Sequence, residues 1–338
     1  MLKKCIGIML ALALVLAACG APAGAPAAPA TGGGGAAAPA APAGGGSEII
    51  MTFGTADATG TFFPVGVALG SIINEHVDGI RVNVETSRGS MENAVNLQDR
   101  IIEFGIINEE ITYRAIHGQD YFEGHPLPDL RAIGALMLNV SSWIAMRDSG
   151  MTMANELGGR SVSIGPEGSG NQSTAYLAFE VLGITPSSIA YMGMGEGAEE
   201  VSDGMLDASH GFAGLPTGAQ LSIAQVHDTV FLGYTEDEIA AILQANPAYF
   251  RSIIPAGTYP GQDEDILTFG VKTLLVVNTD LDEEIAYRIT EAIVNNLDTL
   301  VASHASLAPM SDIEHIAHLN VPLHPGAERF FRGIGVID

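Results

Sequence analysis

The stretch RSVSIGPEGSGNQSTAYLAFEVL, residues 160–182, contains the unit from which the fold is built. It predicts a strand over residues 160–165, a glycine-rich loop over 165–170 and a helix over 173–182. A strand that passes through a short loop into a helix is the repeating unit of a parallel α/β sheet.

The same unit recurs in both halves of the chain. Pro64 is typical of a helix start, and Ser90, with Glu92 in the first turn, is a good N-cap. Further strands are predicted over residues 48–53, 80–85, 104–108, 189–192 and 207–212. This alternation predicts the α/β fold class.

Two extended apolar runs, SSWIAMR at 141–147 and VKTLLVVN at 271–278, predict two crossings between the halves. We expect two α/β lobes joined by two hinge strands. Lobe I would comprise residues 48–142 plus 275–338, and lobe II residues 143–274. A ligand would bind in the cleft between them, outside the carboxyl ends of the strands. Trp143, in the first crossing, is expected to pack between the lobes.

The N-terminal segment predicts export. Residues 1–18 have a basic start followed by an apolar run too short to span a membrane, which indicates a signal peptide. The run ends in LAACG, which resembles a bacterial lipobox and implies lipidation of Cys19; a plain signal peptide cut near Ala18 is the alternative. With Cys19, the Ala-, Pro- and Gly-rich segment makes residues 19–47 a predicted tether.

The net charge disfavours two classes of partner, and the cysteine content indicates how the body is stabilised. The formal net charge is −25, so nucleic acid and anionic lipid headgroups are poor partners. Cys5 and Cys19 are the only cysteines, and Cys5 would leave with the signal peptide. The mature body therefore contains no disulfide and depends on an apolar core.

The loop at 165–175 predicts an anion site. Its glycine spacing suits a phosphate loop, but the lysine that such a loop needs is missing. Unpaired N–H groups and the dipole at a helix start can hold a carboxylate without a lysine. A plain turn with a serine cap is the alternative. The loops at 54–62 and 86–91 repeat the arrangement in the first lobe.

Three charged residues bear on the ligand. Arg88 could bind one carboxylate, and a solvated surface arginine is the alternative. Asp57 and Glu109 could hold an ammonium group, and if both line the cleft we expect an acidic amino acid rather than a keto acid. Tyr259 could place its ring and hydroxyl at the cleft mouth, and a rigid loop that packs the hinge is the alternative. The candidate ligand-binding residues are Thr55, Asp57, Thr61, Phe62, Arg88, Gly89, Ser90, Asn108, Glu109, Ser169, Gly170, Asn171, Gln172, Ser173 and Tyr259.

The sequence contains few signs of catalysis. His315 and His318 lack further ligands and indicate a solvated helix face, and the patterns H-E-x-x-H and G-x-S-x-G are absent. We expect no metal, no cofactor and no enzymatic activity. A hydrolase that uses acidic residues of the cleft is the alternative class.

Five segments in order resemble one family: FGTADATGTFFPVGVALG, ETSRGSMENAVNL, SIGPEGSGNQSTA, IPAGTYPGQDEDI and PLHPGAERFF. From about residue 48 to 332 the chain is similar to the TAXI-type (TRAP-associated extracytoplasmic immunogenic) solute-binding subunits of TRAP transporters. The resemblance implies a type II periplasmic-binding-protein fold. It also implies delivery of an organic anion, such as glutamate or 2-oxoglutarate, to a sodium-coupled permease. A sensory lipoprotein that serves a receptor or kinase is the alternative.

The chain departs from this family at the site. It has Phe62-Phe63-Pro64 where relatives tend to have Tyr-Tyr-Pro, Arg88 where they tend to have Gly, and Asn108-Glu109-Glu110 for a Gln-Ser-Asp-like run. These departures concern the identity of the ligand more than the binding function.

Overall fold

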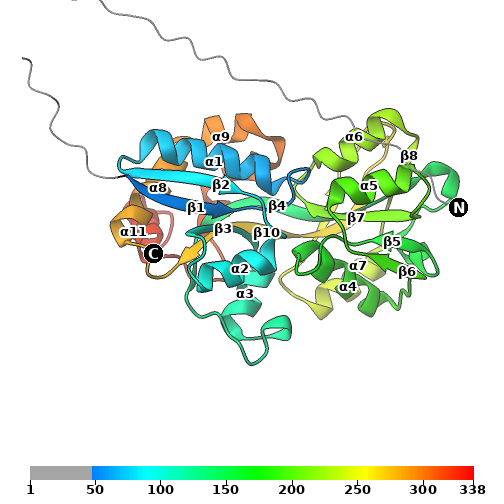
Figure 1. The fold of residues 1–338 in the computed structure, drawn as a ribbon, viewed down its shortest axis with the longest axis horizontal. Helices are drawn as coiled ribbons and strands as arrows, with labels where there is room; N and C mark the ends of the chain where they lie inside the picture. Colours follow the sequence, from blue (N-terminus) through cyan, green and yellow to red (C-terminus); the bar gives the residue numbers. More distant parts are fainter. Residues whose placement is uncertain (1–47) are drawn as a thin grey trace, which may run out of the picture. The chain divides into compact units, whose positions relative to one another are not determined.

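The computed structural model describes residues 48–338, and the predicted signal peptide, Cys19 and tether lie outside them. The described residues form two α/β lobes that share one ten-stranded sheet (Figure 1). The strand order is β2-β1-β3-β10-β4-β7-β5-β6, with β8 paired to β4 and β9 to β10. The predicted α/β class with two lobes is confirmed.

The strands of the first lobe are β1 (Ile49–Gly54), β2 (Ile80–Glu85) and β3 (Phe104–Asn108). Those of the second lobe are β5 (Ser161–Ser163), β6 (Ser188–Ala190), β7 (Ala208–Ala213), β8 (Thr229–Leu232) and β9 (Phe250–Ile254). Within each lobe the pairs β1–β2, β1–β3, β5–β6 and β5–β7 are parallel, as strand–helix alternation requires.

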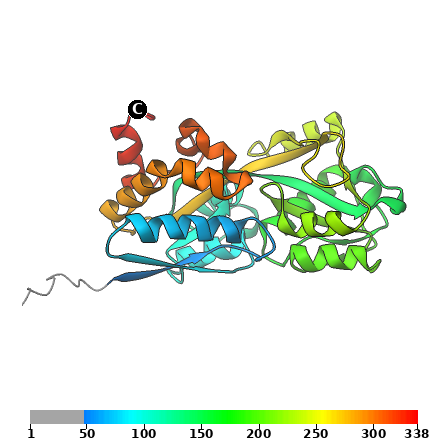
Figure 2. The ribbon, with the colours of Figure 1, turned by 90° about the horizontal axis from the view of Figure 1, so that it is seen from above.

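Two long antiparallel strands, β4 (Leu130–Met146) and β10 (Ile266–Asn278), connect the lobes. Figure 2 shows them passing side by side from one lobe to the other. Both strands are longer than the crossings expected from sequence. The apolar residues 130–140 continue β4 into the first lobe, and residues 266–270 extend β10 in the second lobe, where they pair with β9. The hinge is therefore the middle of a continuous two-stranded ribbon.

The first lobe has helices on both faces of its sheet (Figure 1). One face carries α1 (Phe62–His76), α8 (Glu283–Asn295), α9 (Leu297–Ser303), α10 (Ile313–Ala317) and α11 (Pro325–Gly333). The other carries α2 (Ser90–Gln98) and α3 (Glu109–His117). Phe53, Leu69 and Ile106 are fully buried in the first of these cores. The C-terminal helices thus return to the lobe in which the chain begins.

The second lobe is covered by α4 (Gly170–Leu182), α5 (Met194–Ser202), α6 (Gly218–Val226) and α7 (Glu236–Ala245). Its core contains Trp143, whose indole N–H donates to the Tyr234 hydroxyl at 3.0 Å and whose ring stacks on Phe179. The expectation that Trp143 packs between the lobes is wrong, because its side chain points into the core of the second lobe.

The helix α4 begins earlier than the sequence predicted. Ser169 is its N-cap and accepts a hydrogen bond from the Gln172 N–H at 3.0 Å. This bond satisfies one N–H of the first turn, so the helix starts at Gly170 rather than at Ser173.

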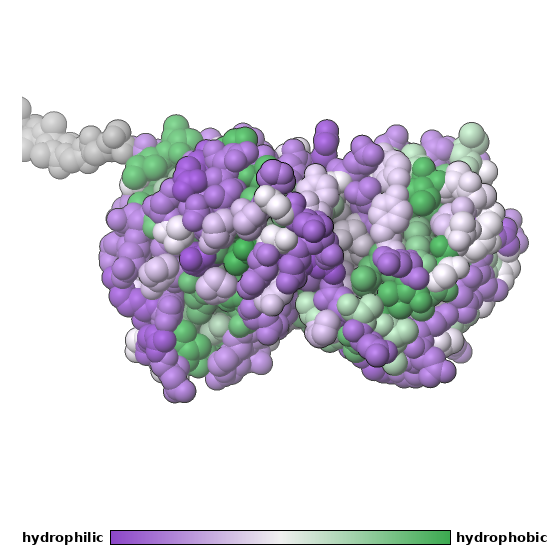
Figure 3. All heavy atoms as spheres, turned by 90° about the horizontal axis from the view of Figure 1, so that it is seen from below, coloured by the Kyte–Doolittle hydropathy of each residue, from purple (hydrophilic) through white to green (hydrophobic). Residues whose placement is uncertain are grey.

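The face in Figure 3 is largely hydrophilic and is indented between the two lobes. Among residues 48–338, the helices are all too short or too polar to cross a bilayer.

Candidate functional site

A cavity of about 40 Å³ lies where the two lobes meet. Such a volume holds on the order of one to three water molecules, so the lobes are closed on each other in this structure. The lining comes from both lobes: Ala56, Asp57, Gly60, Thr61, Phe62, Arg88, Gly89, Ser90 and Asn108 from the first, and Pro166, Ser169, Gly170, Asn171, Met194, Phe212 and Ala213 from the second.

The structure brings most of the candidate residues together at this cavity. The candidates that line it are Asp57, Thr61, Phe62, Arg88, Gly89, Ser90, Asn108, Ser169, Gly170 and Asn171. The loops that carry them follow β1, β2, β3 and β5. The parallel strands β1, β2 and β3 end at the same edge of the first-lobe sheet, so the first-lobe residues lie together there. The strand β5 runs in the opposite direction, so its loop faces them from the second lobe.

The first-lobe wall is built around the start of α2 and the end of β3. Ser90 Oγ accepts a hydrogen bond from the Asn108 N–H at 3.1 Å. The Asn108 side-chain oxygen accepts from Asn139 Nδ2 at 2.8 Å and from the Thr273 hydroxyl at 3.3 Å. These two bonds fix the amide so that its nitrogen, a donor, faces Gly170 of the second lobe.

The second-lobe wall is the start of α4. The N–H groups of Gly170 and Asn171 belong to the first turn, where a helix has no internal acceptor for them. Asn171 Nδ2 donates to the His210 carbonyl at 2.9 Å, and its buried Oδ1 has no partner within residues 48–338. A Cβ on Gly170 would lie 2.7 Å from Asn108 Nδ2 and 3.2 Å from Ser90 Oγ. The first residues of α2 and α4 therefore lie close together, and Gly170 provides the space for this approach.

The cavity has few charges. Arg88 is the single cation among the lining residues, and Asp57 is the single carboxylate. Asp57 Oδ1 accepts from the Thr59 N–H at 2.7 Å and from the Thr59 hydroxyl at 2.5 Å. Its other oxygen lies against Gly193, the N-cap of α5, where the helix dipole favours a negative charge.

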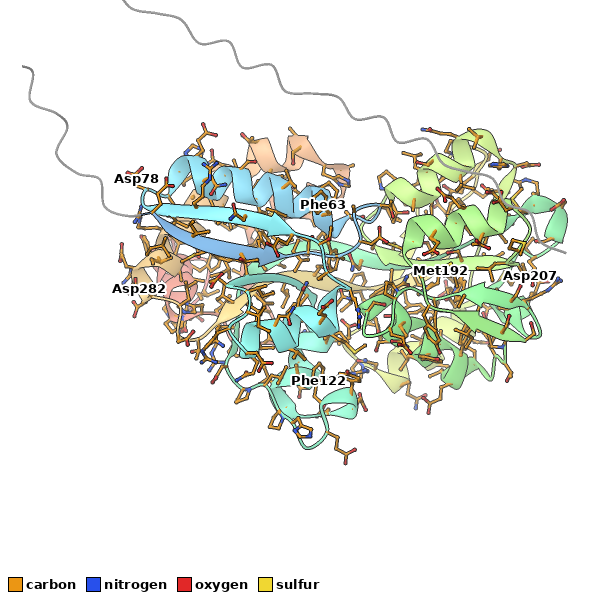
Figure 4. All side chains as sticks on the ribbon, in the orientation of Figure 1. Phe63, Asp78, Phe122, Met192, Asp207 and Asp282 are labelled. Atoms are coloured by element: carbon orange, nitrogen blue, oxygen red, sulfur yellow. The ribbon has the colours of Figure 1, made fainter. Side chains whose placement is uncertain are left out.

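The loop at 57–61 joins the lobes. The Ala219 N–H donates to the Thr59 carbonyl at 3.1 Å, and the Gly195 N–H donates to the Thr59 hydroxyl at 3.0 Å. The Thr61 hydroxyl donates to the Gly214 carbonyl at 2.6 Å. Phe63, at the start of α1, lies at the end of the first lobe that faces the second (Figure 4). The first-lobe loop therefore bonds to the first turns of α5 and α6.

Four candidates lie near the cavity but do not line it. Thr55 is fully buried and donates to the Glu85 carbonyl at 2.6 Å. The Gln172 side chain turns back to accept from the Gly168 N–H at 2.8 Å. Ser173 lies in a separate groove between α4 and the helices α2 and α3. Glu109 is turned away from the cavity and accepts from the Asn320 N–H at 2.6 Å.

Tyr259 is far from its expected place at the cleft mouth. It is 1% exposed, its ring stacks on Phe231 with centroids 4.2 Å apart, and its hydroxyl donates to Gln220 Oε1 at 3.1 Å. The hydroxyl also accepts from the Thr217 N–H at 3.0 Å. Tyr259 thus fixes the start of α6 from within the second lobe, and the prediction of its position is wrong.

The sequence did not predict the apolar lining from the second lobe, chiefly Met194 and Phe212. Phe212 is near the carboxyl end of β7, where a cleft residue could have been sought. Met194 begins α5 and gives no such signal in the sequence.

The histidines do not form a metal site. Residues 48–338 contain no group of three or more His, Cys, Asp or Glu side chains placed to hold a metal ion. Burial lowers the pKa of His210 to about 3 and that of His315 to about 4. Both rings are therefore neutral at physiological pH.

The structure is thus a two-lobed α/β body with a mainly apolar cavity, edged by a few polar groups, at the junction of its lobes. One solved structure shares this fold at low identity. MatC from Rhodopseudomonas palustris, solved with bound malate, is 13% identical, with a TM-score of 0.51 over 76% of this chain and 88% of that one.

The arginine-, lysine-, histidine-binding protein ArtJ from Geobacillus stearothermophilus is 10% identical, with a TM-score of 0.49 over 78% of this chain and 95% of that one. An ABC uptake transporter substrate-binding protein from Streptococcus pneumoniae with bound histidine is 12% identical, with a TM-score of 0.48 over 77% and 94%. The model of the NMT1-like family matches residues 53–335. The chain belongs to the NMT1-like family.

Proposed function

We propose that this protein captures a small organic anion, glutamate or a related dicarboxylate such as 2-oxoglutarate, and delivers it to a TRAP-type membrane permease. The observation that carries the proposal is the meeting of two helix starts, α2 and α4, across a cavity that contains one cation. Helix starts supply unpaired N–H groups and a partial positive charge, and both suit a carboxylate.

The donors have separate roles in this proposal. Ser90, the Asn108 amide nitrogen and the N–H groups of Gly170 and Asn171 would bind one carboxylate at the junction. Arg88 is exposed, and its side chain could reach a second carboxylate at the edge of the cavity. A lysine of the phosphate-loop type is not needed, because the backbone supplies the donors.

The acidic residues give weak support for a ligand with an ammonium group. Such a ligand is expected only if Asp57 and Glu109 both line the cleft, and Glu109 does not. The Asp57 carboxylate already accepts two hydrogen bonds from Thr59. We therefore place a keto acid such as 2-oxoglutarate ahead of glutamate.

Capture would consist of closing the two lobes around the ligand. The cavity is too small to hold a dicarboxylate, so the lobes would part at the β4–β10 ribbon to admit one and would close around it somewhat wider than in this structure. The Thr59 and Thr61 hydrogen bonds to the second lobe would contribute to that closure. The permease would recognise the closed surface. No bond of the ligand is made or broken, so we propose a binding protein and not an enzyme.

The location follows from the sequence. We propose that Cys19 carries a lipid and that residues 20–47 tether the body at the outer face of the cytoplasmic membrane. The resemblance to TAXI-type subunits supports a TRAP permease as the partner, and the fold and family are compatible with this role.

A thermal-shift screen with glutamate, glutamine, aspartate, 2-oxoglutarate and C4-dicarboxylates tests the proposal. A ligand at a hundredfold excess over its dissociation constant adds about 2.7 kcal/mol to the free energy of unfolding. For a body of this size that corresponds to a rise in melting temperature of roughly 4–5 °C.

Arg88→Ala should weaken binding of the best ligand, and we expect a loss of affinity of roughly tenfold or more. Arg81→Ala is the matched control, because Arg81 is an exposed arginine of β2 in the same lobe and outside the cavity. Binding that is equally strong in both variants would contradict the assignment of Arg88. Failure of every anion to shift the melting temperature would contradict the proposed function.

A further inference from the structure

A buried carboxyl group lies behind the ligand cavity, in the first turn of α3. Glu110 follows two residues after Asn108, which lines the cavity, and it is 1% exposed. Its Oε2 has no hydrogen-bond partner within residues 48–338. Its Oε1 lies 3.5 Å from the hydroxyl of Tyr249, which belongs to the core of the second lobe.

Tyr249 extends this contact into the second lobe. Its hydroxyl lies 3.1 Å from the hydroxyl of Thr174 on α4, the helix whose start forms one wall of the cavity. A line of polar contacts therefore runs from α3 of the first lobe through Tyr249 to α4.

The cover over Glu110 comes partly from the second lobe. Glu110 lies at the wall of a groove that is otherwise lined by Glu109, Tyr113, Arg114, Gln119, Asp120 and Asn320 of the first lobe and by residues 245–248 of the second. If the lobes part, residues 245–249 move away with the second lobe, and water reaches the Glu110 carboxyl. Its environment in the open state is therefore more polar than in the closed state.

The charged groups around Glu110 do not compensate for its burial. Glu109 and Arg114 lie on the same helix, and Arg114 is paired with Asp120 at 3.1 Å. Burial raises the pKa of Glu110 to about 7, against the opposing effect of Arg114. Burial also raises the pKa of Tyr249, so its hydroxyl stays protonated and can donate.

We propose that the Glu110 carboxyl couples closure of the two lobes to the uptake of one proton, so that acidification favours the closed state. The inference rests on the proposed function in that closure is the step that captures the ligand. Glu110 acts here through the position of the lobes and does not touch the ligand.

The direction and size of the effect follow from the two environments. The group binds its proton more tightly in the closed state than in the open state, where the pKa should approach the ordinary 4.5. The stabilisation of the closed state is therefore complete below about pH 4.5 and is lost as the pH rises through about 7. Between these limits each pH unit changes the closed-to-open ratio by several-fold, at most about tenfold.

The test measures the distance between the lobes without any ligand. Fluorophores or spin labels are attached to Asp78→Cys and Asp203→Cys, two exposed positions on opposite lobes. In the full chain Cys5 and Cys19 are replaced by Ser, so that only these two sites react. We expect the mean distance to shorten as the pH falls from 8 to 5, with a midpoint between about 5 and 7.

Glu110→Gln should keep the short distance throughout this range, because the amide is always neutral. Glu123→Gln, an exposed acid of the same lobe, is the matched control and should follow the native response. A native chain without a pH response, or a Glu110→Gln variant that keeps the full response, would overturn the proposal.

If Glu110→Gln does not fold, Tyr249→Phe replaces it. This variant removes only the second-lobe hydroxyl that faces the carboxyl, and it should move the midpoint of the response; an unchanged midpoint counts against the coupling. The distance measurement is made without ligand, so it tests the coupling independently of the ligand screen. A failed screen would contradict the proposed function and not the coupling, and a successful screen would not support the coupling.

Discussion

Replacement of Gly170 by alanine should block closure of the lobes without damaging either of them. A Cβ at this position would lie 2.7 Å from Asn108 Nδ2. Asn108 cannot turn away easily, because Asn139 and Thr273 hold its side-chain oxygen. Ordinary contact needs roughly 3.4 Å, so the facing walls must separate by roughly 0.7 Å.

That separation is enough to weaken the bonds across the junction. The Thr61–Gly214 bond would lengthen from 2.6 Å and the Thr59–Ala219 bond from 3.1 Å, and the second would pass beyond hydrogen-bond distance. Each such bond contributes about 0.5–1.5 kcal/mol. Loss of the second bond therefore destabilises the closed state by about 0.5–1.5 kcal/mol, which weakens ligand affinity by roughly 2- to 13-fold.

The folded lobes should tolerate the same substitution. Gly170 is the first residue of α4 and has no positive φ, so alanine fits the backbone and suits the helix. The free energy of unfolding without ligand should stay the same or rise by up to about 1 kcal/mol.

The assay is titration calorimetry with the ligand found in the thermal-shift screen, together with urea unfolding of the ligand-free chain. Gly333→Ala on α11 is the matched control, because a Cβ there meets no atom within 4 Å. An unchanged dissociation constant in Gly170→Ala would refute the reasoning, because it would mean that the two helix starts do not meet in the bound state.

Two further predictions concern residues that affect the stability of the fold and do not bind the ligand. Tyr259→Phe should lower the free energy of unfolding by about 1–3 kcal/mol, because the Thr217 N–H loses its acceptor, while ligand affinity stays within a factor of about two. A large loss of affinity in calorimetry would mean that Tyr259 contributes to ligand binding and would contradict this prediction. Burial lowers the pKa of His210 to about 3, so its contribution to stability is present above about pH 6.5 and is lost as the pH falls. As the pH falls from 6 to 4, the free energy of unfolding of His210→Gln should therefore rise relative to that of the native chain by roughly 1.4 kcal/mol per pH unit. A difference between the two that urea unfolding finds to be the same at each pH would contradict this.

Much of the fold was predictable from local patterns. The strand–loop–helix units at 48–76, 80–98 and 161–182 are each specified by neighbouring residues. Local glycines, caps and apolar runs decide where such a unit starts and ends. The lengths of β4 and β10 were not predictable in the same way, because a continuous apolar run does not indicate where one lobe ends and the next begins.

The sequence by itself determined that the segments after β1, β2 and β3 meet at one edge of the first lobe, and the segments after β5 and β7 at one edge of the second, because parallel strands place their carboxyl ends together. It could not determine which side chains on those loops face the cavity. Asn108 is oriented by Asn139 and Thr273, which are 31 and 165 residues away. Glu109 is turned away by Asn320, 211 residues away, and Tyr259 is held by Thr217 and Gln220.

Only the tertiary structure therefore decided the composition of the site. Backbone direction at a strand end depends on residues close in sequence, whereas a polar side chain turns toward the partner that satisfies its hydrogen bonds. In this protein those partners come from segments distant in the sequence. As a result the starts of α2 and α4 face the cavity, whereas Glu110 lies behind it and is covered by the second lobe.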